Sequence, residues 1–534
     1  MKKKFISHLL LVIIAWSGLA ACRCGCRDGV LVADPALAVL NLEEISVRQL
    51  QQGYKEGRFT ISAVVQGYLQ RIEAIDKNGP KLNSILRVNP DALKIATELD
   101  AELKAGKSRG PLHGIPVILK DNIDSRDPMP TTAGAIALKD SYVAKDSRVA
   151  EKLREAGAVI LAKANMSEWA NFRANFSSSG WSGVGGQTRN PYVLDRNPCG
   201  SSSGSGVAVS TSLCALAIGT ETNGSIVCPA TNNGIVGLKP TVGLVSRTGI
   251  IPISFTQDTA GPMGRTVEDV AIGLGVLAGV DETDAKTLAA RDKIHADYTP
   301  FLKADGLKGK RIGLLKGSGE YHFRVNALFE QAAALLKNRG AEVIEVEGPK
   351  EGPIENDSFL VMLYEFKDGL NRYFAGLKGA APVKDLAGLI EFNKKDPVEL
   401  RCFDQKLLEM AQDKGGLEAA EYKKALEAML KAARADGIDK LMDENKLDAL
   451  MAPTGAPAWK TDLVDGDHFT GSSSSLAAIA GYPSITVPMG FVDDLPVGVS
   501  FFGRAWSEPL LLEIAYSYEQ ATKHRRPPKF LVSD

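Results

Sequence analysis

Twice in this sequence, a helical spacing of apolar residues ends at a glycine and a short apolar run follows at once. Val149 and Leu153 precede Gly157 and the run at 159–162. The same arrangement recurs at Leu328, Ala332, Leu335, Gly340 and the run at 343–346. Apolar residues three or four apart indicate one face of a helix, and a short apolar run indicates a buried strand. The alternation predicts an α/β fold: a central mixed or largely parallel sheet covered by helices on both faces.

A helix and a strand are also predicted in the first part of the chain. Ser62 is a candidate N-cap for a helix on which Val65 and Leu69 recur at helical spacing. The apolar run at 115–119 predicts a short buried strand that ends at Lys120. A lysine that directly follows a buried strand is expected to be buried itself.

Residues from about 356 to 446 differ from the rest of the chain. They are rich in Lys, Glu, Leu and Ala, which predicts consecutive amphipathic helices. On this pattern alone we favour solvated helices that pack against the sheet. The alternative is a wall or lid over a bound ligand.

The first 21 residues have the features of a secretory signal. Positions 2–4 are lysines, and the apolar run at 9–16 is too short to span a bilayer as a helix. Residues 19–22, Leu-Ala-Ala-Cys, resemble the lipobox of bacterial lipoproteins, in which Cys22 is acylated and becomes the new N-terminus. A plain cleaved signal followed by a chance cysteine is the alternative.

This N-terminus predicts an exported protein, located in the periplasm or cell envelope. A tether at 22–40 then leads into one large domain at 41–534. No later segment is long and apolar enough to span a membrane, so we expect membrane contact only through a lipid anchor on Cys22.

Charge and cysteine content exclude several other classes. The formal net charge is -1 and there is no long basic run, so no nucleic acid partner is expected. Cys22, Cys24 and Cys26 give only a weak indication of a metal site, because no histidine accompanies them. Small buried apolar side chains, rather than a disulfide framework, are expected for the dispersed cysteines Cys199, Cys214, Cys228 and Cys402.

The stretch from 198 to 244 is the most informative part of the sequence. It holds Cys-Gly-Ser-Ser-Ser-Gly-Ser-Gly at 199–206 and Gly-Thr-Glu-Thr-Asn-Gly-Ser-Ile at 219–226. A flexible linker is disfavoured, because core-forming apolar residues follow the first segment directly. A phosphate-binding loop is excluded, because no lysine stands at the required place.

One competing interpretation is a nucleophile elbow centred on Ser202. Residues 200–204 match Gly-x-Ser-x-Gly, but that motif must follow a strand and needs a histidine base. Residues 195–199, Asp-Arg-Asn-Pro-Cys, make a poor strand, and no histidine stands in a convincing place, although sequence alone leaves His468 open. We therefore disfavour the elbow.

Several segments together resemble the amidase signature family, from residue 45 to about 520. The family core motif corresponds to 198–205 and 219–225. Further similar segments, in the same order as in the family, are 113–122 (His-Gly-Ile-Pro-Val-Ile-Leu-Lys-Asp-Asn), 162–169, 237–241 and 258–263. The resemblance implies one large amidase domain and a hydrolase that cuts carboxamide C–N bonds.

The family's catalytic residues correspond to Ser225 as nucleophile, Ser201 as bridging serine and Lys120 as base. The resemblance further implies a cis peptide bond between Gly200 and Ser201. Backbone N–H groups of Thr222, Asn223, Gly224 and Ser225 are the expected oxyanion hole. No metal and no cofactor are implied.

Such a lysine can act as a base only when it is neutral. Burial lowers the pKa of a lysine, because desolvation disfavours the charged form. The alternative for Lys120 is a buried ion pair with Asp121 or Asp124. With the resemblance we favour catalysis.

The sequence departs from the commonest family pattern at four positions. Cys199, Ser203 and Asn223 replace glycines, and Glu221 replaces an aspartate. Segments 199–205 and 221–229 look most similar to bacterial peptide amidases, so short peptide C-terminal amides are the leading substrate prediction.

Three other functions are alternatives to this one. A broad aliphatic or aryl acylamidase is the first alternative to the peptide amidase. A tRNA-dependent amidotransferase subunit is disfavoured by export. An exported, non-catalytic binding protein on an amidase scaffold is the alternative of another class.

Overall fold

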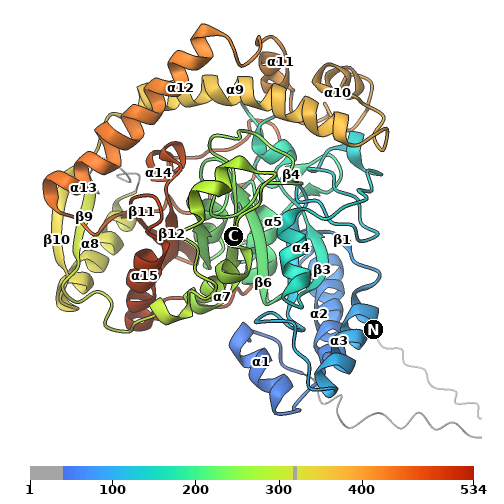
Figure 1. The fold of residues 1–534 in the computed structure, drawn as a ribbon, viewed down its shortest axis with the longest axis horizontal. Helices are drawn as coiled ribbons and strands as arrows, with labels where there is room; N and C mark the ends of the chain where they lie inside the picture. Colours follow the sequence, from blue (N-terminus) through green and yellow to red (C-terminus); the bar gives the residue numbers. More distant parts are fainter. Residues whose placement is uncertain (1–39, 317–321, 534) are drawn as a thin grey trace, which may run out of the picture. The chain divides into compact units, whose positions relative to one another are not determined.

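An eleven-stranded mixed sheet forms the centre of the computed structural model, which describes residues 40–316 and 322–533 (Figure 1). In spatial order the strands are β1 (Ile85–Val88), β3 (Val159–Ala164), β2 (Pro116–Lys120), β6 (Leu216–Glu221), β8 (Thr259–Gly264), β7 (Val236–Lys239), β12 (Ser484–Val492), β13 (Leu495–Phe502), β11 (Ala449–Pro453), β9 (Arg311–Lys316) and β10 (Glu342–Glu347). A separate two-stranded sheet contains β4 (Trp181–Ser182) and β5 (Gly186–Gln187).

Helices flank this sheet, which confirms the α/β prediction. The α-helices are α1 (Val47–Lys55), α2 (Ile61–Arg71), α3 (Ala92–Lys104), α4 (Arg148–Glu155), α5 (Ser203–Ser210), α6 (Val227–Asn232), α7 (Val267–Leu277), α8 (Phe323–Asn338), α9 (Glu351–Gly376), α10 (Leu386–Asn393), α11 (Lys406–Gln412), α12 (Ala420–Ala433), α13 (Asp439–Asn445), α14 (Ser475–Ala480) and α15 (Glu508–Thr522). Short 3₁₀ or π helices span Ile72–Asn78, Ile136–Leu138, Glu168–Asn171, Ala285–Ala290, Thr299–Phe301 and Arg434–Ile438.

The motif residues lie together where the central strands β2 and β6 end. The strand β2 is wholly buried and pairs in parallel with β3 on one side and β6 on the other. Because parallel strands end at the same edge, Lys120 at the end of β2 lies near the loop that follows Glu221 at the end of β6. The strand β8 is antiparallel to β6, with Thr259 opposite Glu221, so Asp258 also lies at this edge.

The predicted amphipathic helices extend over the sheet as α9 to α13. The long helix α9 lies beside α12 (Figure 1) and packs into two apolar clusters. Phe366 and Leu370 contact the cluster that includes Trp169, whereas Val361 and Tyr364 belong to the cluster with α12 and α14. The second cluster also contains the strand residues Leu315, Val346 and Phe502, so these helices pack on the sheet as expected.

The predicted N-cap Ser62 is wrong by two residues. The helix α2 begins at Ile61, and the Thr60 side chain accepts the Ala63 N–H at 3.1 Å. The Ser62 hydroxyl instead donates to the Asp100 carboxylate at 2.6 Å, which ties α2 to α3. A threonine and a serine are both good caps, so local sequence does not decide between them.

The expected signal at 1–21, the lipidation site at Cys22 and all but the last residue of the tether at 22–40 lie outside the described residues. One compact unit is formed by Asn41–Asp534. Across the two described ranges, no helix has both the length and the apolar character required to cross a bilayer.

Candidate active site

The amine of Lys120 is enclosed at the end of β2. Its side chain is fully buried, and Nζ lies 2.7 Å from Ser201 Oγ. The other two contacts are with Thr220, at 2.8 Å to Oγ1 and 3.0 Å to the carbonyl oxygen. The structure therefore brings together the lysine and the bridging serine that the sequence predicted.

Burial has a direct electrostatic effect on this amine. Desolvation lowers the pKa of Lys120 to about 7, although the carboxylates of Asp258 and Glu221 act in the opposite direction. The alternative partners Asp121 and Asp124 interact with another buried lysine, Lys163, which opposes the rise in their pKa to about 6 caused by burial. Among the described residues, no ion pair joins Lys120 to Asp121 or Asp124, and its amine contacts Ser201 and Thr220 instead.

Ser201 lies in a tightly packed turn before α5. The Gly200–Ser201 peptide bond is cis, as the family resemblance implied. A Cβ atom on Gly200 would lie 2.2 Å from Ser167 Oγ, so only glycine fits there. The Ser167 N–H donates to the Ser201 carbonyl at 3.1 Å, which fixes the turn against the neighbouring loop.

Ser225 lies in the loop between β6 and α6. Its carbonyl accepts the Ser202 N–H at 3.2 Å. This hydrogen bond joins the loop that contains Ser225 to the loop that contains Ser201; these are the two serine loops. Glu221 Oε2 accepts the N–H groups of Ile226 at 2.8 Å and Val227 at 3.1 Å, the two residues after Ser225. Gly224 has a φ of +80°, a conformation that favours glycine. The Ser225 side chain is thus held by a well-anchored turn.

The predicted oxyanion loop at 222–225 presents four backbone N–H groups. Within the described residues, none of these four groups donates to an acceptor of the protein. Unpaired N–H groups beside a cavity are available for a bound oxyanion.

A cavity of about 780 Å³ opens onto both serines. Ser201, Ser225 and the loop residues between β6 and α6 line its floor, whereas α9 contributes Glu351, Glu355 and Met362 to its wall. Met362 belongs to the helical segment that begins at about 356, so this segment packs on the sheet and also contributes to a cavity wall.

A disulfide between Cys199 and Cys228 lines the same cavity. The expectation that the dispersed cysteines are small buried apolar residues is therefore wrong for this pair. It holds for Cys214, which is free and buried. The bond forms because the sheet brings the two serine loops together, with Cα atoms 5.9 Å apart.

The structure does not support the nucleophile elbow. No strand leads directly into Ser202, since residues 188–202 hold none, and its hydroxyl donates to the Thr220 carbonyl at 3.1 Å while accepting the Thr220 N–H at 3.2 Å. His468 is exposed and lies 3.4 Å from Asp462. Ser202 is therefore a structural tie between two segments.

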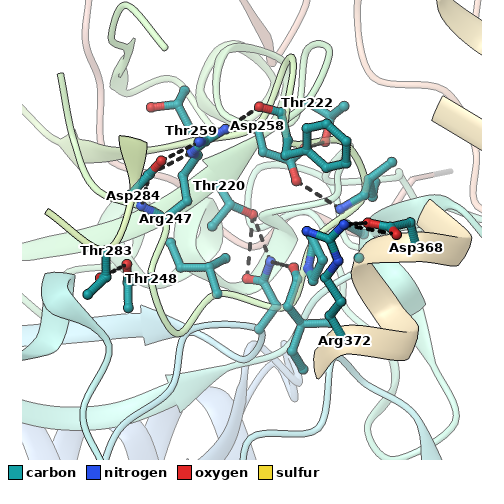
Figure 2. A pocket seen from close by; sticks show the side chains of 18 of the residues that line it. Thr220, Thr222, Arg247, Thr248, Asp258, Thr259, Thr283, Asp284, Asp368 and Arg372 are labelled. Carbon is teal, nitrogen blue, oxygen red and sulfur yellow. Dashed lines mark hydrogen bonds and ion pairs between the residues drawn. The ribbon is translucent and has the colours of Figure 1, made fainter. Parts of the chain in front are cut away.

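A second cavity of about 340 Å³ lies next to the first. Figure 2 shows Thr220 between two ion pairs, Arg247 with Asp284 on one side and Arg372 with Asp368 of α9 on the other. The wall between the two cavities contains the shared residues Ala170, Thr222 and Ile253.

Asp258 is a site residue that the sequence analysis did not single out. Thr222 Oγ1 donates to its Oδ1 at 2.5 Å, and the N–H groups of Ile253 and Ser254 donate to Oδ2. Burial raises the pKa of Asp258 to about 6. Asp258 thus contacts the loop at 222–225 and also raises the pKa of Lys120. Its position in segment 258–263, which resembles the family, could have identified it from the sequence.

Thr220 and Asn122 were also missed. Asn122 Nδ2 donates to Thr220 Oγ1 at 3.1 Å, the atom that Lys120 contacts. Both residues belong to the shared motifs, at 113–122 and 219–226, but neither residue type suggests acid–base chemistry by itself. In the described part of the chain, no cluster of three or more His, Cys, Asp or Glu side chains could hold a metal ion.

Comparison with known proteins gives consistent matches over nearly this whole unit. The sequence model of the family described as Amidase matches residues 63–512. A probable amidase of Arabidopsis thaliana is 41% identical over 502 residues, 93% of this chain and 93% of that protein. Native peptide amidase from Stenotrophomonas maltophilia is 51% identical, with a TM-score of 0.88 over 92% of this chain and 99% of its own. A bacterial aryl acylamidase of the amidase signature family is 25% identical, with a TM-score of 0.75 over 90% and 96%.

Proposed function

Since this chain belongs to the amidase family and is an amide-hydrolysing enzyme, we propose that it cleaves the carboxamide bond through an acyl-enzyme on Ser225. Lys120 is the base, and Ser201 carries the proton between them. The observation that carries this proposal is the buried amine of Lys120, 2.7 Å from Ser201 Oγ.

The three contacts of Lys120 determine where the lone pair of its neutral amine points. A neutral amine has two N–H donors and one lone pair, and it has three partners here. The Thr220 carbonyl can only accept, and Thr220 Oγ1 accepts the second N–H. The lone pair then faces the Ser201 hydroxyl, which donates to it. This arrangement leaves Ser201 Oγ ready to accept a proton from Ser225.

Catalysis then follows with balanced proton transfers. Ser225 Oγ attacks the amide carbonyl carbon while its proton passes to Ser201, whose own proton passes to Lys120. The proton returns along this path to the departing nitrogen, so that ammonia or an amine leaves as the C–N bond breaks. Water attacks the resulting ester by the same relay, releasing the acid and restoring Ser225.

The loop at 222–225 supplies the oxyanion hole in this proposal. The negative oxygen of the tetrahedral intermediate accepts hydrogen bonds from its free N–H groups. Each such donor typically contributes about 3–4 kcal/mol to transition-state stabilisation.

We propose peptide C-terminal amides as the substrates, with release of ammonia. The likeness to the peptide amidase, at 51% identity over almost its full length, supports this choice. A cavity of about 780 Å³ is large enough for a short peptide. A broad aliphatic or aryl acylamidase is the second candidate, supported by the more distant likeness to the aryl acylamidase.

We further propose that the chain is exported to the periplasm or cell envelope and anchored through a lipid on Cys22. The basic start, the short apolar run and the Leu-Ala-Ala-Cys sequence support this proposal. The Cys199–Cys228 disulfide agrees with it, because disulfides persist in oxidising compartments. Mass spectrometry of the membrane fraction, which detects a lipid on the mature N-terminus, tests it.

The central experiment measures ammonia release from a peptide amide by wild type and Ser225→Ala. We expect turnover by wild type and none by the variant, and a fluorophosphonate probe that labels Ser225. Labelling of Ser202 instead would support the elbow. Silence of the wild type on a panel of amides with varied acyl and leaving groups would support a non-catalytic binding protein.

A further inference from the structure

The side-chain amide of Asn223 is held at both ends. Its Nδ2 donates to Ser475 Oγ at 3.2 Å, and its Oδ1 accepts from Ser474 Oγ at 2.7 Å. Ser475 is the first residue of α14 and Ser474 is its N-cap. Asn223 lies two residues before Ser225, where the commonest family pattern has glycine. A glycine could make neither contact.

A carboxylate on α9 completes this network. Ser475 Oγ donates to Glu355 Oε1 at 2.6 Å. A carboxylate can only accept a hydrogen bond, so the hydroxyl proton of Ser475 points to Glu355. A lone pair of Ser475 Oγ then faces Asn223 Nδ2. Glu355 therefore fixes the direction of both hydrogen bonds and the orientation of the Asn223 amide.

All four residues line the cavity that contains Ser225. The helix α14 packs against α9, so the network joins three segments that are distant in sequence (Figure 1). Since Asn223 belongs to the loop at 222–225, a displaced Asn223 displaces the N–H groups of that loop. Catalysis is sensitive to such shifts, because a misplacement of about 1 Å can cost about a hundredfold in rate.

We infer that Glu355 and Ser475 are positioning residues that act through Asn223 to hold the oxyanion loop in its productive geometry. This inference rests on the proposed function of that loop. It also assigns α9 a part in catalysis beyond that of a cavity wall: the helix fixes the loop beside the nucleophile through one hydrogen-bonded path.

The test is a double-mutant cycle on a small peptide amide, with kcat and KM measured separately. We expect Glu355→Ala and Ser475→Ala each to lower kcat about tenfold and to leave KM within about twofold. Glu355→Gln keeps an accepting oxygen and should retain most of kcat. In an Asn223→Gly background, Glu355→Ala should change kcat by less than about twofold, because the path is already broken.

The matched control is Asp357→Ala, which removes a carboxylate from the same helix without touching the cavity lining. It should keep wild-type kcat, and all variants should keep the wild-type melting temperature. The inference is overturned if Glu355→Ala lowers kcat equally in the Asn223→Gly background, or raises KM alone, or has no effect while Ser225→Ala abolishes turnover. Turnover by Ser225→Ala would instead overturn the proposed function.

Discussion

Cys199 is bonded to Cys228 across the floor of the active-site cavity. Cys199 lies two residues before Ser201, and Cys228 lies three residues after Ser225. The bond therefore fastens together the two loops between which the proposed relay passes a proton, at a place where small movements would affect catalysis.

Replacing both cysteines by serine should lower stability and turnover together. The disulfide closes a loop with a sequence separation of 29, for which the chain-entropy model gives about 3.6 kcal/mol of stabilisation. Thermal unfolding and kcat on a peptide amide measure the two effects. Cys402→Ser, which alters a free cysteine, is the control and should resemble wild type. A double variant with unchanged melting temperature and kcat would contradict this expectation.

Activity should rise with pH through about 7. Lys120 must be neutral to accept a proton, and burial sets its pKa at about 7. Below that pH the protonated fraction grows, so kcat/KM should fall about tenfold per pH unit. Asp258, with a pKa of about 6, titrates below this limb. A profile of kcat/KM from pH 5 to 9, in about half-unit steps, tests this, and a flat profile would contradict a lysine base.

The same shift predicts a pH dependence of stability. In the unfolded chain Lys120 has its ordinary pKa of 10.5 and carries a proton that the folded state lacks between about pH 7 and 10.5. The unfolded state binds more protons in this window, so this group makes stability rise with pH there. Urea unfolding at two pH values, for wild type and Lys120→Met, isolates the effect, because the variant should lose the dependence. An equal slope in both proteins would count against it.

Glu221 should matter for stability as well as for rate. Its carboxylate accepts two N–H groups after Ser225, and its charge opposes the lowering of the pKa of Lys239 that burial causes. Glu221→Ala leaves these groups unpaired, which should cost about 3–5 kcal/mol and lower kcat. Glu221→Gln keeps one accepting oxygen and should lose less stability. Urea unfolding ranks the three proteins, and equal losses by the two variants would show that the hydrogen bonds contribute little.

The sequence predicted those site residues that lie within contiguous motifs. The apolar run before Lys120 indicated a buried strand, and the serines followed from the resemblance of their segments. The contact between Lys120 and Ser201 also depends on the parallel pairing of β2 and β6, which local patterns do not encode.

Partners from distant segments could not be predicted in this way. Glu355 lies on an amphipathic helix whose pattern gives no sign of which carboxylate faces the cavity. Cys199 and Cys228 are separated by a whole helix and strand, so their proximity appears only when the sheet is assembled. Contiguous motifs thus indicate the proposed reacting groups, whereas the groups that position them depend on tertiary packing.

The last prediction concerns Thr220, whose hydroxyl accepts a hydrogen bond from Lys120 at 2.8 Å. Thr220→Val keeps the shape of the side chain but removes an acceptor that favours the charged amine, so the pKa of Lys120 should fall further. The acid limb of kcat/KM should therefore move to lower pH, while the plateau drops because the amine is less well oriented. A pH profile of Thr220→Val beside wild type measures both effects, and Thr220→Ser, which keeps the hydroxyl, should restore the wild-type limb. A limb that moves to higher pH would mean that Thr220 stabilises the neutral amine, and the orientation of Lys120 derived from its three contacts would be wrong.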